Sequence, residues 1–529
     1  MEFIDYIYLV NLIVVILSFI FVLRYNLHMF QLNGYKNKVH LRWLKINRQK
    51  QAILVIFLVS AVLAAVARIF ALALLMLIGS FIVLLYYYIL SKAKAKKKLV
   101  YTNRVKRLIA TNLILAVILT GLIFPATTLT DFTFIRKAVL GATLVNLIEP
   151  LLVILSNILN KPIEKSINNY YINDAKKILK QCPNLLVIGI TGSYGKTSVK
   201  HFLSALLQAK YNVLMTPESY NTPMGVVKTI RSGLKPVYDI FVCEMGARNI
   251  GDIKEICDIV SPTHGIITSI GPQHLESFKT IDNIIKTKFE LADALPKEGL
   301  IFLNGDNEYI KNKEGLNHPI YYGIDNPNVD YRAVDITVSS KGTEFTVISP
   351  KKEEVRFQTK LLGRHNVVNI VGAIAVSNTL GIPLEDLIIP VRRLQPVQHR
   401  LQLIEKGSNI TIIDDAFNSN PAGSKAALDT LALFDGLRIL ITPGMVELGD
   451  KEDYYNKEFG RQAAVSCDYV ILVGKRQTQA IREGLISEGF DESKLYITDY
   501  FDDAINHAYN IHTDKHKYIL LENDLPDNY

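Results

Sequence analysis

The sequence predicts an N-terminal α-helical membrane domain, followed by a central α/β domain with a mostly parallel sheet and by a C-terminal α/β domain of Rossmann-like type. Three observations support this fold class. Long apolar runs are concentrated in residues 1–160, short apolar strands alternate with helical segments in the rest of the chain, and the net charge changes sign between the two parts. A chain of 529 residues is also too long for a single hydrophobic core.

Charge and cysteine content narrow the class of protein. Residues 1–160 contain 18 Lys and Arg against 4 Asp and Glu, whereas the remaining residues contain 41 against 46. A pI near 9.0 on a soluble domain would indicate nucleic-acid binding. The basic residues instead lie in loops between apolar runs, as the positive-inside rule requires, so we expect no nucleic-acid partner. The four cysteines have neither metal-ligand nor CxxC spacing.

Five apolar runs are each close to the roughly 20 residues that a helix needs to cross a bilayer core. They cover approximately residues 5–23, 52–67, 69–90, 108–125 and 138–158. The second run is short and is expected to form a hairpin with the third around Arg68. The first lacks the basic region and the cleavage site of a signal peptide, so we interpret it as a span. Glu149, inside the fifth run, is costly there unless it is paired or near the interface.

Loop charge predicts the orientation of the spans. Residues 24–50 contain seven Lys or Arg and residues 91–107 contain eight, with no acid in either loop. Both loops are expected in the cytoplasm, which places the N-terminus, the Arg68 turn and the 126–136 loop outside. The chain is therefore predicted to be a multi-pass protein of a bacterial cell membrane, in contact with membrane lipid, with everything after about residue 158 cytoplasmic.

A phosphate-binding loop (P-loop) follows the first predicted strand of the central domain. The strand Leu185–Ile190 leads into Thr191-Gly192-Ser193-Tyr194-Gly195-Lys196-Thr197-Ser198, and Val199–Leu207 has the pattern of a helix. Glycines let backbone N–H groups approach phosphate oxygens, and the helix N-terminus adds positive potential. Lys196 is expected to reach the β- and γ-phosphates, and Thr197 is expected to hold Mg²⁺. The spacing is one residue longer than in the common pattern.

Two further strands end in groups that suit a metal site. The strand 237–243 is followed by Glu244, and the strand 265–270 is followed by a segment that contains His274. The carboxyl ends of parallel strands meet at one edge of a sheet, so both side chains should lie beside the phosphate loop. Glu244 is a candidate metal ligand. A lone histidine is more often structural, but three strand ends that carry Lys-Thr, Glu and His favour one shared site.

Several motifs, in order, resemble the Mur ligases, which are ATP-dependent enzymes that add amino acids to peptidoglycan precursors. The motifs are GITGSYGKTS (189–198), SYNTPMGV (219–226), EMGA (244–247), IGPQHLESF (270–278), KTKFEL (286–291), FLNGD (302–306), GRHNVVN (363–369), DDAFNSNP (414–421) and PGMVELG (443–449). The similarity covers about residues 180–529, and the pattern is most similar to the branch whose amine substrate is D-alanyl-D-alanine. It implies an ADP-forming acid–amino-acid ligase of cell-wall biogenesis with ATP and Mg²⁺ as cofactors.

Carried over motif by motif, the resemblance implies roles for individual residues. Lys196, Lys288, His274 and Glu244 would form the catalytic set, in which Lys288 looks like the family's carbamylated lysine. Thr197, Glu244 and His274 would serve magnesium ions. The ATP-binding residues would be Ile190, Thr191, Gly192, Ser193, Tyr194, Gly195, Lys196, Thr197, Ser198, Asn304, Asn366, Asn369, Arg400 and Asp415. The residue before Arg400 is His399, where the family more often has glycine.

Each of these residues also has a simpler interpretation. Lys288 could be an ordinary lysine on a helix surface, and Asn366 and Asn369 could cap a helix. Asp414 and Asp415 follow the predicted strand 410–413, so one of them could cap a turn. Gly-Lys at 474–475 is expected to be a strand-to-helix turn rather than a second phosphate site.

The predicted chemistry is amide-bond formation through an acyl phosphate. ATP phosphorylates a carboxylate, and the amine then attacks the acyl phosphate, so catalysis consists mainly of positioning and charge neutralisation. In the family, the last domain delivers the amine and closes over ATP. The predicted domains are a membrane domain at 1–160, a central P-loop domain at 161–402 and a C-terminal domain at 403–529.

The spans replace the N-terminal domain with which soluble family members hold a UDP-sugar. Only about 20 residues separate the last span from the first strand, so we expect no room for that domain. The partners would be an amino acid or dipeptide and a cell-wall precursor, either UDP-muramoyl-peptide or lipid-linked. Three alternatives stay open: a membrane anchor on a cytosolic-type ligase, a polymer-forming ligase of the poly-γ-glutamate type, and a P-loop ATPase that drives transport.

Overall fold

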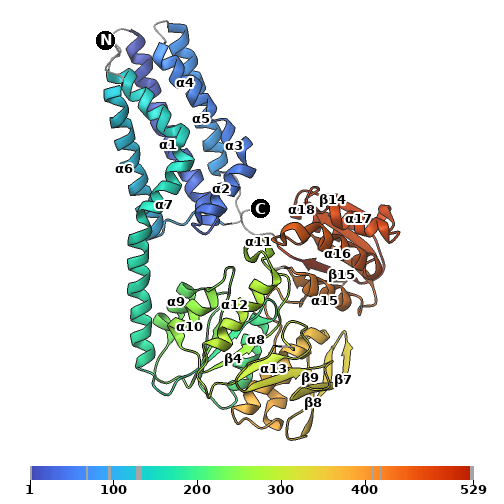
Figure 1. The fold of residues 1–529 in the computed structure, drawn as a ribbon. Helices are drawn as coiled ribbons and strands as arrows, with labels where there is room; N and C mark the ends of the chain where they lie inside the picture. The colour runs from blue at the N-terminus through green and yellow to red at the C-terminus, as the bar shows by residue number, and fades with distance from the viewer. Residues whose placement is uncertain are drawn as a thin grey trace. The chain divides into compact units, whose positions relative to one another are not determined.

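The computed structural model describes residues 3–66, 70–92, 97–126, 134–311, 313–407, 409–417 and 419–524. The chain divides into two compact units, the first ending at Asn169 and the second beginning at Tyr170 (Figure 1). Arg68 and most of the 126–136 loop, to which the sequence analysis assigned turns, lie outside the described residues.

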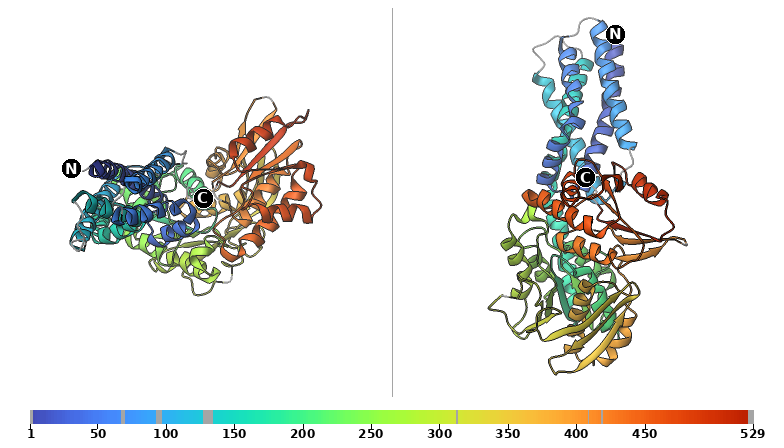
Figure 2. Two further views of the ribbon diagram at one scale, coloured as in Figure 1. Left: turned by 90° about the horizontal axis from the view of Figure 1, so that it is seen from above. Right: turned by 90° about the vertical axis from the view of Figure 1, so that its right-hand side faces the viewer.

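The first unit is helical. Its helices are α1 (Phe3–Leu32), α2 (Asn37–Ile46), α3 (Arg48–Ala52), α4 (Val55–Val66), α5 (Phe70–Lys92), α6 (Asn103–Ala126) and α7 (Phe134–Lys180), the last of which continues into the second unit. The long helices of this unit run alongside one another in both Figure 1 and Figure 2.

Among the residues that the structure describes, four helices are long and apolar enough to cross a membrane. By length and composition these are Tyr6–Leu32, Phe70–Lys92, Asn103–Leu122 and Phe134–Lys180, and they overlap four of the five predicted runs. The run at 52–67 corresponds to α4, which has only 12 described residues. A fifth span therefore stays a prediction.

Apolar side chains are exposed on the long helices, whereas polar groups lie inside the first unit. Ile13, Val59 and Leu75 are each more than half exposed. Glu149 is fully buried, and its Oε2 accepts a hydrogen bond of 2.6 Å from Asn26 Nδ2. The cost of a carboxyl group inside the fifth apolar run is thus offset by a partner on α1.

The central part of the second unit is built on a nine-stranded sheet of order β2-β3-β1-β4-β5-β6-β7-β8-β9. The strands from β2 to β7 pair in parallel, and β7, β8 and β9 pair antiparallel. Their bounds are β1 (Leu186–Thr191), β2 (Val213–Met215), β3 (Ile240–Glu244), β4 (His264–Ile267), β5 (Ile301–Asn304), β6 (Pro319–Gly323), β7 (Tyr331–Ser339), β8 (Gly342–Ile348) and β9 (Glu354–Thr359).

Helices cover both faces of the parallel part of this sheet, so β1 and β3 are buried almost throughout, whereas β9 at the antiparallel edge alternates buried and exposed residues. Along β1, Ile188 packs in a core with α8 and α13, and Val187 packs on the opposite face with α9 and α10. The helices and short helical turns are α8 (Lys196–Leu207), α9 (Pro223–Gly233), α10 (Asp252–Val260), α11 (Leu275–Phe278), α12 (Ile281–Asp293), α13 (Arg364–Thr379), η1 (Glu385–Leu387) and α14 (Ile388–Arg392).

The C-terminal part has a six-stranded sheet of order β10-β11-β15-β12-β13-β14, in which only β10 is antiparallel. The strands are β10 (Gln402–Glu405), β11 (Ile410–Asp415), β12 (Leu437–Thr442), β13 (Tyr469–Val473), β14 (Leu495–Thr498) and β15 (Lys517–Glu522). The helices are α15 (Pro421–Leu431), η2 (Gly449–Lys451), α16 (Glu452–Ser466), α17 (Gln479–Ser487), η3 (Glu492–Lys494) and α18 (Phe501–Asn510). Mostly parallel sheets in both parts confirm the α/β prediction.

Two details differ from the prediction. Asp414 and Asp415 belong to β11 rather than following it, and Asp414 also caps the turn after this strand, because its Oδ1 accepts a hydrogen bond of 3.1 Å from the Ala416 amide. The strand expected at 265–270 is β4, which ends at Ile267.

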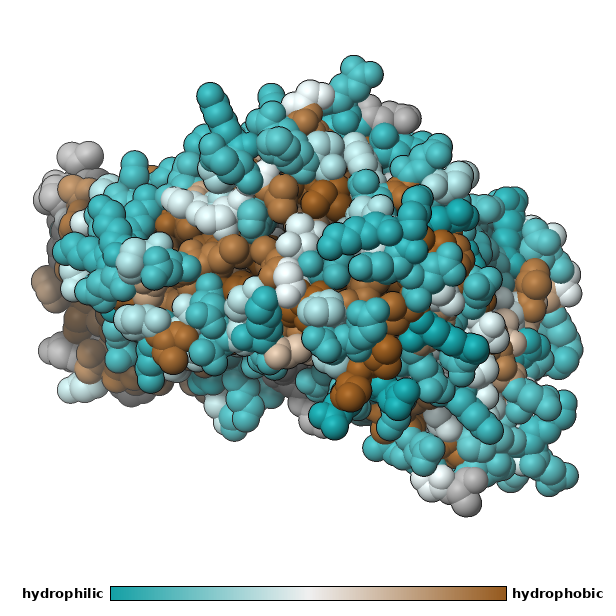
Figure 3. All heavy atoms as spheres, turned by 90° about the horizontal axis from the view of Figure 1, so that it is seen from below, coloured by the Kyte–Doolittle hydropathy of each residue, from teal (hydrophilic) through white to brown (hydrophobic). Residues whose placement is uncertain are grey.

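The face of the molecule shown in Figure 3 is covered mainly by hydrophilic residues, with smaller apolar areas between them.

Candidate functional site

The phosphate loop occupies the turn between β1 and α8. Gly195 has φ +80°, and a Cβ added there would lie 2.6 Å from Asn369 Oδ1. Gly192 has φ +153°, and a Cβ there would collide with the Thr268 hydroxyl. Neither position has room for a side chain, and the left-handed φ values favour glycine. Glycine at these two positions therefore lets the loop backbone pack closely at the start of α8, where a helix N-terminus favours a phosphate group.

The rest of the loop is seated on the segment that follows β4. The Ser193 amide donates to the Ser269 carbonyl at 2.6 Å, and the Ser193 hydroxyl donates to the Gly271 carbonyl at 3.0 Å. The Tyr194 hydroxyl donates to the Pro272 carbonyl at 2.9 Å. Residues between β4 and α11 therefore hold the loop in place.

Lys196 begins α8 and points back over the loop. Its Nζ donates to the carbonyls of Gly192 at 2.7 Å and Ser193 at 3.0 Å. Burial lowers the pKa of Lys196 to about 8; the Glu244 carboxylate opposes this effect and the Arg400 guanidinium adds to it. The three charges therefore act on one another within one site.

Glu244 ends β3 beside the loop, as predicted. Its Oε1 accepts hydrogen bonds from Thr197 Oγ1 at 3.2 Å and from Asn221 Nδ2 at 3.0 Å. Its Oε2 lies 3.0 Å from Lys200 Nζ. Burial alone would raise the pKa of Glu244, but the ammonium groups of Lys200 and Lys196 and the Asn221 hydrogen bond hold it below its ordinary value. Glu244 is thus an ionised carboxylate beside the Thr197 hydroxyl.

This donor set fits Mg²⁺. Within the described parts of the chain, His, Cys, Asp and Glu form no group of three or more that could hold a metal ion. Mg²⁺ does not need such a group, because it usually keeps several waters and binds one or two carboxylates together with substrate phosphates. Glu244 and Thr197 would hold the ion, and it would neutralise charge on the phosphates.

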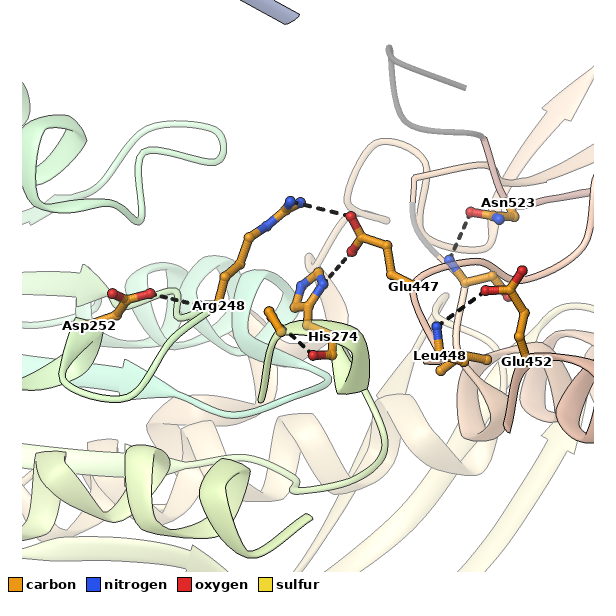
Figure 4. Close-up of polar contacts among 9 residues, drawn as sticks. Arg248, Asp252, His274, Glu447, Leu448, Glu452 and Asn523 are labelled. Atoms are coloured by element: carbon orange, nitrogen blue, oxygen red, sulfur yellow. Dashed lines mark hydrogen bonds and ion pairs between the residues drawn. The ribbon is translucent and has the colours of Figure 1, made fainter. Parts of the chain in front are cut away.

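His274 has a partner that the sequence analysis did not anticipate. It adopts a left-handed φ of +53° at the start of α11, and its Nδ1 pairs with the carboxylate of Glu447 from the C-terminal part. Glu447 also lies 3.3 Å from Arg248, so one carboxylate joins two central-domain side chains (Figure 4). Burial lowers the pKa of His274, although Glu447 opposes this shift. The magnesium role of His274 stays a prediction.

Lys288 is buried on α12, which excludes its interpretation as an ordinary surface lysine. Burial, strengthened by the charge of Lys196, shifts the pKa of Lys288 well below its ordinary value. A neutral amine is the form that reacts with carbon dioxide, so this environment suits the carbamylated lysine that the family resemblance implies.

The three predicted asparagines differ in their surroundings. Asn369 packs against Gly195 of the phosphate loop. Asn304 is buried at the end of β5, where its Nδ2 donates to Ser269 Oγ at 3.3 Å. Asn366 donates to the Leu362 carbonyl at 2.8 Å, which satisfies its amide locally at the start of α13. Asn369 and Asn304 therefore adjoin the loop and its support, whereas the contact of Asn366 is structural.

Arg400 and Asp415 mark the start of the C-terminal part. The Arg400 guanidinium lies 4.6 Å from the centre of the Phe417 ring. Burial raises the pKa of Asp415 to about 6, and Arg400 opposes the shift. His399 has φ +58°, so it adopts the left-handed conformation suited to the glycine more common in the family, and its Nδ1 lies 2.7 Å from Asp414 Oδ2. His399 therefore gives the turn before Arg400 the left-handed conformation that a glycine would adopt readily at this position.

Four residues of the site were not predicted from the sequence. Arg248 lies just after the EMGA motif, and Asn221 and Glu447 lie inside quoted motifs without an assigned role. Lys200 lies four residues after Lys196, so both residues fall on one face of α8, and this spacing was the available signal.

A phosphate loop and a carboxylate at the carboxyl edge of one parallel sheet, joined to a second mostly parallel domain, define a two-domain nucleotide-dependent enzyme. The model of the Mur ligase middle domain matches residues 190–377, and that of the Mur ligase glutamate ligase domain matches residues 399–522. The UDP-N-acetylmuramoyl-tripeptide–D-alanyl-D-alanine ligase of Escherichia coli (strain K12) is 32% identical over 316 residues, which is 59% of this chain and 70% of that protein. The chain belongs to the Mur ligase family, whose members are ATP-dependent, ADP-forming ligases.

Two further comparisons agree. The ligase of the same name from Bacillus subtilis (strain 168) is 33% identical over 286 residues, which is 54% of this chain and 61% of that protein. The chain therefore spans less than two thirds of that relative. The crystal structure of MurF from Acinetobacter baumannii matches with a TM-score of 0.61 and 25% identity, covering 68% of this chain and 77% of that one.

Proposed function

We propose that this protein joins D-alanyl-D-alanine, or a related amino acid or peptide, to the carboxylate of a muramoyl-peptide precursor at the expense of ATP. The observation that carries the proposal is the convergence of Lys196, Glu244 and Arg400 at the phosphate loop, with Lys288 buried nearby. The named relatives favour this chemistry over a polymer-forming ligase or a transport ATPase.

The residues have complementary tasks in such a reaction. Backbone N–H groups of the loop and Lys196 would hold the triphosphate, so that the γ-phosphate faces the acceptor carboxylate. Mg²⁺ between Glu244 and Thr197 would offset charge on the transferred phosphoryl group. The C-terminal part would bring the amine to the acyl phosphate, and the contact of Glu447 with His274 and Arg248 shows one way in which the two parts meet.

We further propose that the first unit is embedded in a bacterial membrane, with the second unit in the cytoplasm. Four helices of sufficient length and apolar character support this proposal, as do the exposed apolar side chains of the first unit and the acid-free basic segments at 24–50 and 91–107. A membrane location would let the enzyme act on a lipid-linked precursor as well as on a UDP-linked one.

The test uses the full chain, purified in detergent or in nanodiscs. Phosphate release is measured with ATP, Mg²⁺ and D-alanyl-D-alanine, with either UDP-N-acetylmuramoyl-tripeptide or its lipid-linked counterpart, and products are identified by mass spectrometry. Turnover with the UDP form supports an anchored ligase, and turnover with the lipid form alone supports a membrane-presented acceptor. Phosphate release without a new amide, or unchanged activity in Lys196→Ala, contradicts the proposal.

A further inference from the structure

Lys200 is a fully buried lysine with a carboxylate partner at the candidate metal site. Its side chain is 0% exposed, and that of Glu244 is 1% exposed. Lys200 Nζ lies 3.0 Å from Glu244 Oε2 and donates a 2.5 Å hydrogen bond to the Glu218 carbonyl. Burial of an ion pair is costly unless its geometry is good and further hydrogen bonds are made, so its presence inside this domain calls for a role.

The contacts of Glu244 are divided between its two oxygens. Oε1 accepts hydrogen bonds from Thr197 Oγ1 and Asn221 Nδ2, whereas Oε2 forms an ion pair with Lys200 Nζ at 3.0 Å that lacks the geometry of a hydrogen bond. This division turns Oε1 toward the Thr197 hydroxyl, which is the other oxygen expected to hold Mg²⁺. Lys200 therefore determines which oxygen of Glu244 faces the loop.

The same ammonium group also holds the segment that carries Asn221. Glu218 has a left-handed φ of +42°, and its carbonyl points at Lys200 Nζ. Asn221 lies three residues further along and donates to Glu244 Oε1. Through two contacts, Lys200 fixes both the carboxylate and the segment that supports it.

Two effects of Lys200 on a bound cation oppose each other. Its charge repels the cation, but its contact keeps the carboxylate of Glu244 oriented. Without Lys200, the next cation that acts on Glu244 is Lys196. Pairing with Lys196 would occupy the oxygen needed for the metal ion and draw Lys196 away from the phosphates, so the loss of orientation outweighs the relief of repulsion.

We propose that Lys200 is a positioning residue for Mg²⁺: by holding Glu244 Oε2 and the Glu218 carbonyl, it presents Glu244 Oε1 and Thr197 Oγ1 together to the metal ion that accompanies ATP. This inference rests on the proposed function only in taking ATP and Mg²⁺ as the ligands of the site. It does not depend on which acceptor or amine is used.

The experiment measures binding of a fluorescent ATP analogue to the full-length protein at increasing Mg²⁺ concentration. Lys200→Met is expected to raise the Mg²⁺ concentration at half-saturation about 10- to 100-fold, as loss of a partner that orients a metal ligand typically does. The affinity of the protein for the ATP analogue in the absence of Mg²⁺ should fall by a smaller factor. A merely structural role would lower both affinities equally. An equal loss, or an unchanged or lower Mg²⁺ midpoint in folded protein, overturns the proposal.

Three further variants separate positioning from stability. Lys200→Arg keeps the charge and should restore the Mg²⁺ midpoint to within a few-fold of the unaltered protein. Lys517→Met removes another buried lysine, whose Nζ donates to the Ala508 and Tyr509 carbonyls, and should leave the midpoint unchanged. If circular dichroism shows that Lys200→Met does not fold, Lys200→Gln, which keeps a donor and loses the charge, takes its place with the same expected shift.

Nucleotide binding also separates this inference from the proposed function. A shifted midpoint in a protein that ligates none of the offered substrates supports Lys200 positioning and counts against the proposed substrates. If the protein ligates the offered substrates but its Mg²⁺ midpoint is unchanged in the Lys200 variants, the proposed function is supported and the positioning role of Lys200 is overturned.

Discussion

Replacing Glu447 with glutamine should weaken the contact between the central and C-terminal parts without touching the phosphate loop. The carboxylate pairs with His274 and with Arg248 (Figure 4). The hydrogen bond to His274 is charge-assisted and largely buried, so it stabilises the contact between the two parts by about 1.5–3 kcal/mol. The pair with Arg248 contributes only about 0–1 kcal/mol, because the Arg248 side chain is 57% exposed. Glutamine has nearly the same shape as glutamate but no charge. We therefore expect the contact between the two parts to lose about 2 kcal/mol of stability, which is roughly 30-fold in the equilibrium between contacting and separated parts.

The assay combines kinetics with a distance measurement. Glu447→Gln should reduce kcat/KM for the amine about 30-fold, with nearly unchanged affinity for ATP, and fluorescence transfer between labels on the two parts should report a larger separated population. Glu458→Gln is the matched control, since Glu458 pairs with Arg461 inside α16. An unchanged kcat/KM, or an equal loss in the control, would refute the reasoning.

Three other predictions test the loop, the core and a buried carboxyl group. Gly195→Ala introduces a Cβ at φ +80° and 2.6 Å from Asn369 Oδ1, so a strain of about 1–2 kcal/mol plus the clash should reduce ATP affinity about tenfold or more in a binding titration. Phe202→Ala removes a ring that is 2% exposed in the main core, and it should lower the free energy of unfolding by about 3–5 kcal/mol in denaturant titrations, with no such loss for the exposed Tyr500→Ala. Burial raises the pKa of Glu522 from 4.5 to about 8. The folded protein therefore keeps a proton that the unfolded chain releases, so stability should fall as pH rises from about 4.5 to 8. Thermal unfolding of Glu522→Gln should lack that part of the pH dependence, and an identical slope in both proteins would contradict the assignment.

Much of the fold and site could be predicted because the signals are local. The phosphate loop requires glycines and Lys-Thr within a few residues of one strand end, and the structure places Lys196 and Gly195 accordingly. Glu244 ends a strand next to β1 because the carboxyl ends of parallel strands share an edge. Strand ends were less predictable: Asp414 and Asp415 continue β11, since pairing with β10 and β15 extends that strand beyond its apolar residues.

By itself, the sequence determined the family, the two mostly parallel sheets, the apolar helices and most residues around the phosphate loop, because periodicity and motif spacing are properties of short segments. Only the tertiary structure decided the partners of those residues. Lys200 meets Glu244 across α8 and β3, and His274 meets Glu447 although 173 residues separate them in the chain. Such pairs depend on strand order and on how the two parts meet, which long-range packing sets and no local pattern encodes.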